Sequence, residues 1–277
     1  SPEIHSGDFH FKIADLVVSE TIKPISRAQG DKGTTFILPF NNIKKPPEIA
    51  RSEVEASLRE LGENTLLFLN HIRKIEYLLP DGSLGYLERK EKSDNRIEIL
   101  VKQPEIDGEP LPSNYLRFQK TVKVKDEDGE LKDCRIAIAF KLAKHENPDT
   151  SNLPTWKIVP LARGQVSIYF PAEKETSNLQ FHIHAPFAST VARDSVRNCP
   201  ANDALRDHIA ELMAASMTSI RDQGLLTVDF LATLPNPKDN LLHFYEPIRK
   251  KLVDAYKSQN LVPMKKGGHK AADIIFR

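Results

Sequence analysis

A succession of short strand-like runs, joined by tight turns and followed by one long amphipathic helix, most limits the possible folds of this chain. The predicted strands cover residues 75–79, 96–102, 115–125 and 131–143. Asp126–Gly129 is a strong hairpin signal between the last two strands. Residues 202–222 then carry apolar side chains at helical spacing. Strands grouped ahead of a helix predict an α+β fold, with a mixed, largely antiparallel sheet and helices on one side.

The remaining segments add shorter elements to this scheme. We predict a hairpin between residues 156–161 and 165–170, because Ala162–Gly164 resembles a tight turn. Apolar spacing and length predict three further helices, over residues 48–61, 66–72 and 240–258. Residues 261–276 are expected to form either a short β-hairpin or a connector to a following region.

Charge and cysteine content exclude several classes of protein. The 277 residues include 39 basic and 38 acidic side chains, so the net charge of +1 requires neither nucleic acid nor an anionic membrane as partner. No apolar run approaches the roughly 18 residues that a membrane span needs, and the N-terminus lacks a signal-peptide core. Two cysteines, Cys134 and Cys199, do not make a disulfide framework. A reducing compartment is therefore expected, the cytoplasm in the first place, with the nucleus as the alternative.

The N-terminal 42 residues are difficult to assign to the main sheet. Strand patterns occur at residues 9–13 and 34–40, separated by the turn-like Gly30–Gly33. Two strands alone do not form a stable sheet. These residues are therefore either the end of a larger domain or edge strands of the sheet that follows.

The segment before the long helix has the clearest functional pattern. Apolar residues alternate with two histidines over residues 181–185, which predicts a strand with one buried face. A loop that presents Arg193 follows, and the helix of residues 202–222 comes next. A guanidinium held between two rigid elements is well placed to reach an anion, because its fork matches phosphate oxygens. The plain alternative is a solvated arginine, or one that pairs with Asp194 or Asp207.

Three other groups of residues are candidate binding sites. His182 and His184 lie two apart on a strand and could share a metal, but no third ligand is near in the sequence, which favours structural or surface roles. Thr34 and Thr35 could bind phosphate or simply favour the start of a strand. Lys265–Lys270 lacks the Gly-Lys-Ser/Thr of a P-loop, so a solvated turn is expected there.

Four segments, taken in chain order, resemble one superfamily. Gly33–Phe40 resembles the last ATP-site element of the Bergerat-fold (GHKL) ATPases, and Pro2–Phe11 resembles the segment after the Gly-rich lid in their sacsin / NO VEIN branch. Leu66–Glu76 is similar to the segment that follows the ATPase domain in that branch. Val191–Asp194 resembles the loop of the 90-kDa heat-shock chaperones whose arginine reaches the γ-phosphate.

The resemblance implies a domain organisation and a set of site residues. Residues 1–45 would be the end of an incomplete Bergerat ATPase domain, residues 46–238 a middle or transducer domain, and residues 239–277 a helix and connector. Gly33, Thr34 and Thr35 would lie beside the nucleotide phosphates, and Arg193 would act in catalysis. No metal site within this chain is implied.

The departures from the family matter equally. The family's metal-binding Asn, catalytic Glu, Asp-x-Gly-x-Gly loop and Gly-rich lid would all precede Ser1, and none appears later in the sequence. Asp194 replaces the family's Glu, and Thr190–Ala192 replace Asn-Val-Ser. We therefore expect ATP and magnesium only in a complete protein, and no ATP hydrolysis by this chain alone.

Three functions follow as hypotheses. The first is the transducer part of an ATP-driven conformational machine, coupling the nucleotide state of an upstream ATPase domain to a protein or nucleic-acid partner. The second is a scaffold module that binds protein or nucleic acid without ATP. The third, suggested by bacterial relatives of the branch, is a defence or restriction ATPase.

Overall fold

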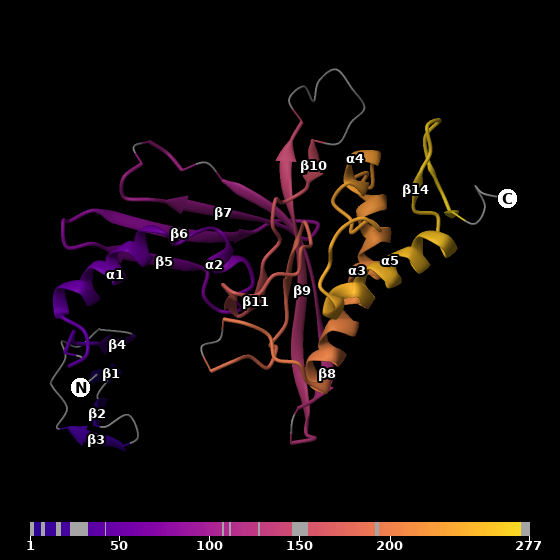
Figure 1. Ribbon diagram of the computed structural model, residues 1–277. Coiled ribbons are helices and arrows are strands. Elements are labelled where there is room, and N and C mark those ends of the chain that lie inside the picture. Colours follow the sequence, from indigo (N-terminus) through magenta and orange to yellow (C-terminus); the bar gives the residue numbers. More distant parts are fainter. Residues whose placement is uncertain are drawn as a thin grey trace. The chain divides into compact units, whose positions relative to one another are not determined.

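The chain divides into two compact units, residues Ser1–Leu61 and Gly62–Arg277, which we call the N-terminal and C-terminal units. The computed structural model describes residues 3–6, 9–14, 18–22, 33–41, 43–106, 108–110, 112–126, 128–145, 155–191 and 194–272 (Figure 1). Among these residues, no helix is both long and apolar enough to span a membrane. The division falls later in the chain than the predicted domain boundary after residue 45.

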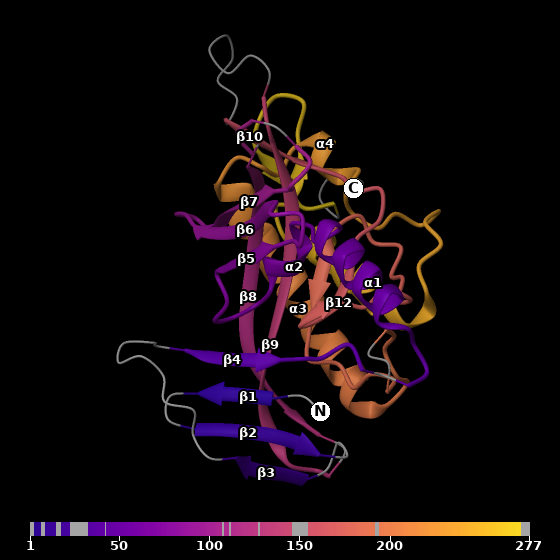
Figure 2. The same ribbon diagram turned by 90° about the vertical axis from the view of Figure 1, so that its left-hand side faces the viewer.

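The N-terminal unit contains a small antiparallel sheet and one helix (Figure 2). Its strands are β1 (Glu3–Ser6), β2 (Phe9–Ala14), β3 (Val18–Ile22) and β4 (Thr34–Ile37). They pair in the order β3-β2-β1-β4, so they form a sheet of their own and are not edge strands of the larger sheet. Helix α1 (Pro47–Arg59) follows, close to the predicted helix of residues 48–61, and it includes Pro47 in its first turn, where proline is tolerated. The assignment of these strands to an ATPase domain stays a prediction.

A mixed, largely antiparallel sheet of nine strands forms the C-terminal unit, which confirms the predicted fold class. The strands are β5 (Lys74–Leu78), β6 (Leu84–Glu91), β7 (Arg96–Lys102), β8 (Ser113–Lys125), β9 (Leu131–Lys144), β10 (Trp156–Val159), β11 (Val166–Ile168), β12 (Phe170–Pro171) and β13 (His182–His184). Their order is β12-β11-β13-β9-β8-β7-β6-β5, and β10 also pairs with β9. Only β11 and β13 pair in parallel among these described strands.

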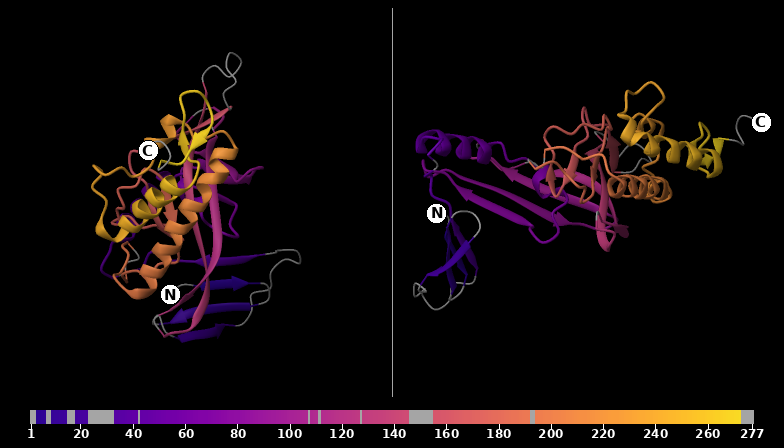
Figure 3. Two further views of the ribbon diagram at one scale, coloured as in Figure 1. Left: turned by 90° about the vertical axis from the view of Figure 1, so that its right-hand side faces the viewer. Right: turned by 60° about the horizontal axis from the view of Figure 1, so that its bottom comes forward.

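The long helix α3 (Pro200–Asp222) packs on β8 and β9 at one face of this sheet, and the long helix α5 (Glu246–Ser258) packs against α3 (Figure 3). The short helices α4 (Val228–Leu231) and η2 (His243–Tyr245) connect them. Phe140 packs between Phe181 and Phe230, with ring centroids 5.0 and 5.6 Å apart. The predicted apolar stripe of α3 faces this core, where Ile209, Met213 and others are fully buried. Residues 262–263 and 269–270 pair as β14 and β15, which confirms the hairpin alternative.

Residues 62–70 cover the opposite face of the sheet, which corrects the predicted helix over residues 66–72. Helix α2 spans only Asn64–Leu67, and the following Phe68 and Leu69 are buried as well. One face of a helix cannot bury so many consecutive apolar side chains. The carbonyls that a longer helix would use accept hydrogen bonds from two buried arginines instead: Arg89 binds those of Leu66 and Leu69, and Arg117 binds that of Leu67 at 2.8 Å.

Two further predictions about strands were wrong. β13 is buried on both faces rather than one, because residues 62–70 cover the face on which His182 and His184 lie. The predicted hairpin around Ala162–Gly164 does not form, since β10 pairs with β9. Gly164 instead lies against the chain before β13: its amide donates to the carbonyl of Leu179 at 2.7 Å, and a Cβ there would lie 2.0 Å from the carbonyl oxygen of Phe181.

Candidate functional site

The loop of residues 188–197, between β13 and α3, is the predicted location of the catalytic arginine. Arg193 itself, together with Ala192, lies outside the described residues. The residues on both sides of it are described, and Ser189 forms an isolated antiparallel bridge with Val196. The amide of Arg197 donates to the carbonyl of Ala188 at 2.9 Å, so the two ends of the loop are held together.

Asn202, in the first turn of α3, ties this loop to the helix. Its side chain is fully buried and makes three hydrogen bonds to the loop backbone. The amide of Ala188 donates to Oδ1 at 2.8 Å, and Nδ2 donates to the carbonyls of Ala188 at 2.8 Å and Arg197 at 2.6 Å. The side-chain amide of Asn202 thus uses both its donor and its acceptor groups. Removing it would leave buried backbone groups of the loop without hydrogen-bond partners, so it fixes the base of the loop. We did not predict this residue; an Asn in the first turn of a predicted helix is the only signal that the sequence offers.

Asp194 holds the loop from within. Its carboxylate accepts hydrogen bonds from the hydroxyls of Thr190 at 2.8 Å and Ser195 at 3.3 Å, and pairs with Lys174 at 2.6 Å. These contacts, that of Lys174 first, lower the pKa of Asp194 to about 2. Asp194 therefore stays ionised across the physiological range and joins the loop to the segment after β12.

Both aspartates that were considered as partners for Arg193 have other partners. Asp194 is engaged as described above, and Asp207 pairs with Arg206 at 2.8 Å. Neither carboxylate therefore depends on Arg193 for its pairing.

A cavity of about 440 Å³ adjoins the C-terminal side of the loop. Glu175 lies in it and accepts hydrogen bonds from the amide of Val196 at 2.8 Å and from the hydroxyl of Tyr245 at 2.9 Å. The guanidinium of Arg206 stacks on Phe244, 5.0 Å from the ring centroid, and pairs with Asp203 at 2.6 Å. Asp203 therefore neutralises Arg206, one of the two arginines that line the cavity, and Glu175 links the loop to the start of α5.

The predicted phosphate-binding residues lie in the N-terminal unit. Gly33 is exposed with φ 146°, and no atom lies within 4 Å of the position that a Cβ would take, so backbone conformation rather than close packing favours glycine there. Thr34 is exposed at the start of β4. Thr35 pairs with His5 in the sheet, and its side chain lies outside the described residues. Their role at a nucleotide stays a prediction.

The two histidines of β13 have structural roles and do not belong to the loop. The amide of Gln165 donates to Nδ1 of His182 at 3.0 Å, and Nδ1 of His184 lies 3.1 Å from the carbonyl of Ser167. His184 also stacks on Phe68 with ring centroids 5.3 Å apart. Within the part of the chain that the structure describes, no three His, Cys, Asp or Glu side chains are placed to hold a metal ion.

Comparison with known proteins adds no relative to this description. No protein-family model matches the chain, and neither a curated protein nor a solved structure is detectably similar to it. The loop of residues 188–197, with its contacts to α3 and the neighbouring segments, is therefore the candidate functional site.

Proposed function

We propose that this chain is the transducer part of a GHKL-type conformational ATPase. In this proposal an upstream ATPase domain binds ATP and magnesium, and Arg193 contacts the γ-phosphate when the two parts close. The contact exists only in the closed state, so it favours closure and the hydrolytic transition state over nucleotide binding itself. Gly33, Thr34 and Thr35 would line the phosphate side of the same nucleotide site.

The observation that supports the proposal best is the tie between the loop and α3. Asn202 holds both ends of the loop from the first turn of a helix that packs along the main sheet. A force on the loop would reach the sheet through α3 and would reach α5 through Glu175 and Tyr245. A coupling element needs such continuity between a contact point and a rigid body.

The test is ATP turnover by a protein that contains both this chain and the upstream ATPase domain. Arg193→Ala should reduce turnover by about 10-fold to 1,000-fold, whereas nucleotide affinity in the open state should barely change. Arg193→Lys should restore little, because a point charge does not reproduce the bidentate fork. Arg197→Ala is the matched control on the same loop and should keep most of the activity. Loss of turnover in Arg197→Ala with near-normal Arg193→Ala would contradict the assignment.

The scaffold module is the alternative function, and Asn202 separates the two hypotheses. In a transducer, Asn202→Ala should lower turnover with little change in nucleotide affinity, because the loop loses its anchor. A thermal melt of the variant would show whether the unit remains folded. If the chain is instead a scaffold module that does not use ATP, neither the Arg193 nor the Asn202 substitution should alter ATP turnover or nucleotide affinity.

A further inference from the structure

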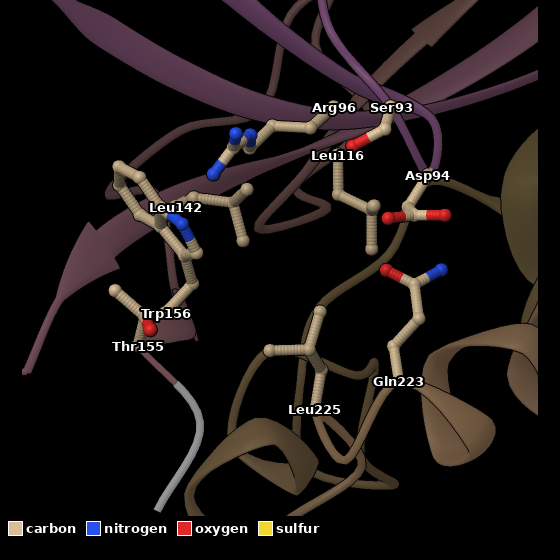
Figure 4. A pocket seen from close by; sticks show the side chains of 9 residues that line it. All are labelled: Ser93, Asp94, Arg96, Leu116, Leu142, Thr155, Trp156, Gln223 and Leu225. Carbon is tan, nitrogen blue, oxygen red and sulfur yellow. The ribbon is translucent and has the colours of Figure 1, made fainter.

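A second cavity, of about 300 Å³, lies between the β6–β7 turn, the start of β10 and the C-terminal end of α3 (Figure 4). It belongs wholly to the C-terminal unit and shares no residue with the loop of residues 188–197. Its volume is at the lower end of the range for small-molecule sites. Three leucines form its apolar wall: Leu116, Leu142 and Leu225.

A rigid turn places the carboxylate of Asp94 at one end of this cavity. Asp94 and Asn95 have φ values of 57° and 62°, as in a type I′ hairpin turn, which Asp and Asn tolerate better than most residues. The amide of Lys92 donates to the carbonyl of Arg96 at 2.8 Å, and the amide of Arg117 donates to that of Asn95 at 2.8 Å. Among the described residues, no side chain pairs with the Asp94 carboxylate.

The end of α3 places a second acceptor opposite Asp94. Gly224 has φ 72°, and the amide of Leu225 donates to the carbonyl of Ile220 at 3.0 Å, which is the Schellman arrangement at a helix C-terminus. Nε2 of Gln223 donates to Ser219 at 3.1 Å, so Oε1 remains available. Figure 4 shows this oxygen turned toward the Asp94 carboxylate. The C-terminal end of a helix adds partial negative charge, so this end of the cavity favours a cationic donor.

The other end of the cavity is positively charged. The guanidinium of Arg96 lies 5.0 Å from the ring centroid of Trp156, and the ammonium of Lys144 lies 5.6 Å from it. Cation–π contacts of this kind hold the cations and the ring in fixed positions. The Arg96 guanidinium makes no hydrogen bond to any described residue, and Figure 4 shows it on the opposite side of the cavity from Gln223.

We propose that this cavity binds a small zwitterion, an amino acid with an apolar side chain. The ligand's ammonium group donates to Asp94 and Gln223, and its carboxylate accepts from Arg96, as charge-assisted hydrogen bonds. The apolar side chain packs on the three leucines. A plain amine or a plain acid would form a charge-assisted hydrogen bond at only one of the two charged ends. This site is independent of the proposed ATPase coupling.

Trp156 makes the proposal directly testable, because it is the only tryptophan among the 277 residues. Tryptophan fluorescence, excited where the six tyrosines absorb little, therefore reports on this cavity. Titration with L-leucine should give a saturable change with a Kd of about 0.1–1 mM. Two analogues complete the design: 4-methylpentanoate lacks the ammonium group, and isopentylamine lacks the carboxylate. Each should bind at least about 10-fold more weakly than leucine.

Matched variants locate the binding energy. Asp94→Asn and Arg96→Gln should each weaken leucine binding by at least about 10-fold, measured by calorimetry, whereas Asp128→Asn on the β8–β9 turn should have no effect. A thermal melt checks that the variants remain folded. If leucine gave no saturable signal up to about 10 mM, or if either analogue bound equally well, the proposal would be wrong. Tighter binding of guanosine than of leucine would also overturn it, because it would indicate a nucleobase site.

Discussion

Lowering the pH from about 7.5 to about 5 should destabilise the C-terminal unit through His182 and His184. Burial lowers the pKa of each imidazole from 6.5 to about 4. For His182 the nearby Glu63 opposes this shift and Lys141 adds to it. For His184 the carbonyl of Ser167 opposes the shift. Both side chains are therefore neutral in the folded state at neutral pH.

The direction of the pH effect follows from these values. A histidine whose pKa falls on folding contributes its full stability above the unfolded pKa of 6.5. As the pH falls below 6.5, the unfolded chain takes up protons that the folded chain rejects until about pH 4. Each histidine should therefore cost about 2 kcal/mol of unfolding free energy between about pH 7.5 and pH 5.

Urea denaturation at several pH values measures this loss. The neutral tautomers suggest the matched variants: Nδ1 of His182 accepts from Gln165, whereas Nδ1 of His184 faces a carbonyl and carries the proton. Asparagine can place either an acceptor or a donor at the Nδ1 position without titrating in this range. His182→Asn and His184→Asn should each reduce the pH-dependent loss by about 2 kcal/mol.

A histidine outside the buried face of β13 provides the control. His208 is partly exposed on α3 beside Glu211, so His208→Asn is the matched control for removing a histidine that is not buried. If the single His182 and His184 variants kept the full pH dependence of the parent chain, the burial argument would be refuted. The loss would then have to come from other titrating groups, such as the paired carboxylates.

Three further predictions concern stability and nucleotide binding. Gly164→Ala should cost at least about 2 kcal/mol in urea denaturation, because the new Cβ would lie 2.0 Å from the carbonyl oxygen of Phe181; near-normal stability would contradict that packing. Arg117→Met should cost about 2–3 kcal/mol, since the buried carbonyl of Leu67 loses its donor and Glu91 keeps only its ion pair with Arg89; a neutral effect would show that this arginine is dispensable. The chain alone should bind ATP no more tightly than about 1 mM, and a micromolar constant in calorimetry would overturn the expectation that the adenine and magnesium ligands lie elsewhere.

Local patterns were sufficient for the elements whose burial repeats regularly. β7 spans the predicted residues 96–102, and the Asp126–Gly129 turn joins β8 and β9 as expected. The apolar spacing of residues 202–222 likewise predicted the buried face of α3. Each of these signals depends on the neighbouring residues of one segment, and the tertiary structure did not override them.

The sequence did not predict β6, because the residues at its buried positions are not all apolar and the alternation typical of a strand is therefore absent. Arg89 occupies one of them with only 4% of its surface exposed, since residues 62–70 bring backbone carbonyls to its guanidinium. The same segment buries His182 and His184, so the expected polar face of β13 became an internal one. Residues 62–70, which are distant in the sequence, supply the acceptors for Arg89 and cover the two histidines. The hydrophobic periodicity within β6 or β13 carries no information about such a segment.

The candidate sites divide in the same way. The sequence pointed to the loop before α3, because a strand, a break and a long helix follow one another there. Asn202 and Glu175 support this loop only through contacts that folding creates. Glu175 accepts hydrogen bonds both from the loop, at Val196, and from Tyr245 at the start of α5. The cavity beside Trp156 joins a β6–β7 turn, β10 and the end of α3, which lie far apart in the chain. Periodicity reports which face of a segment is buried, whereas the partners of a buried charge or amide depend on which segments the fold brings together.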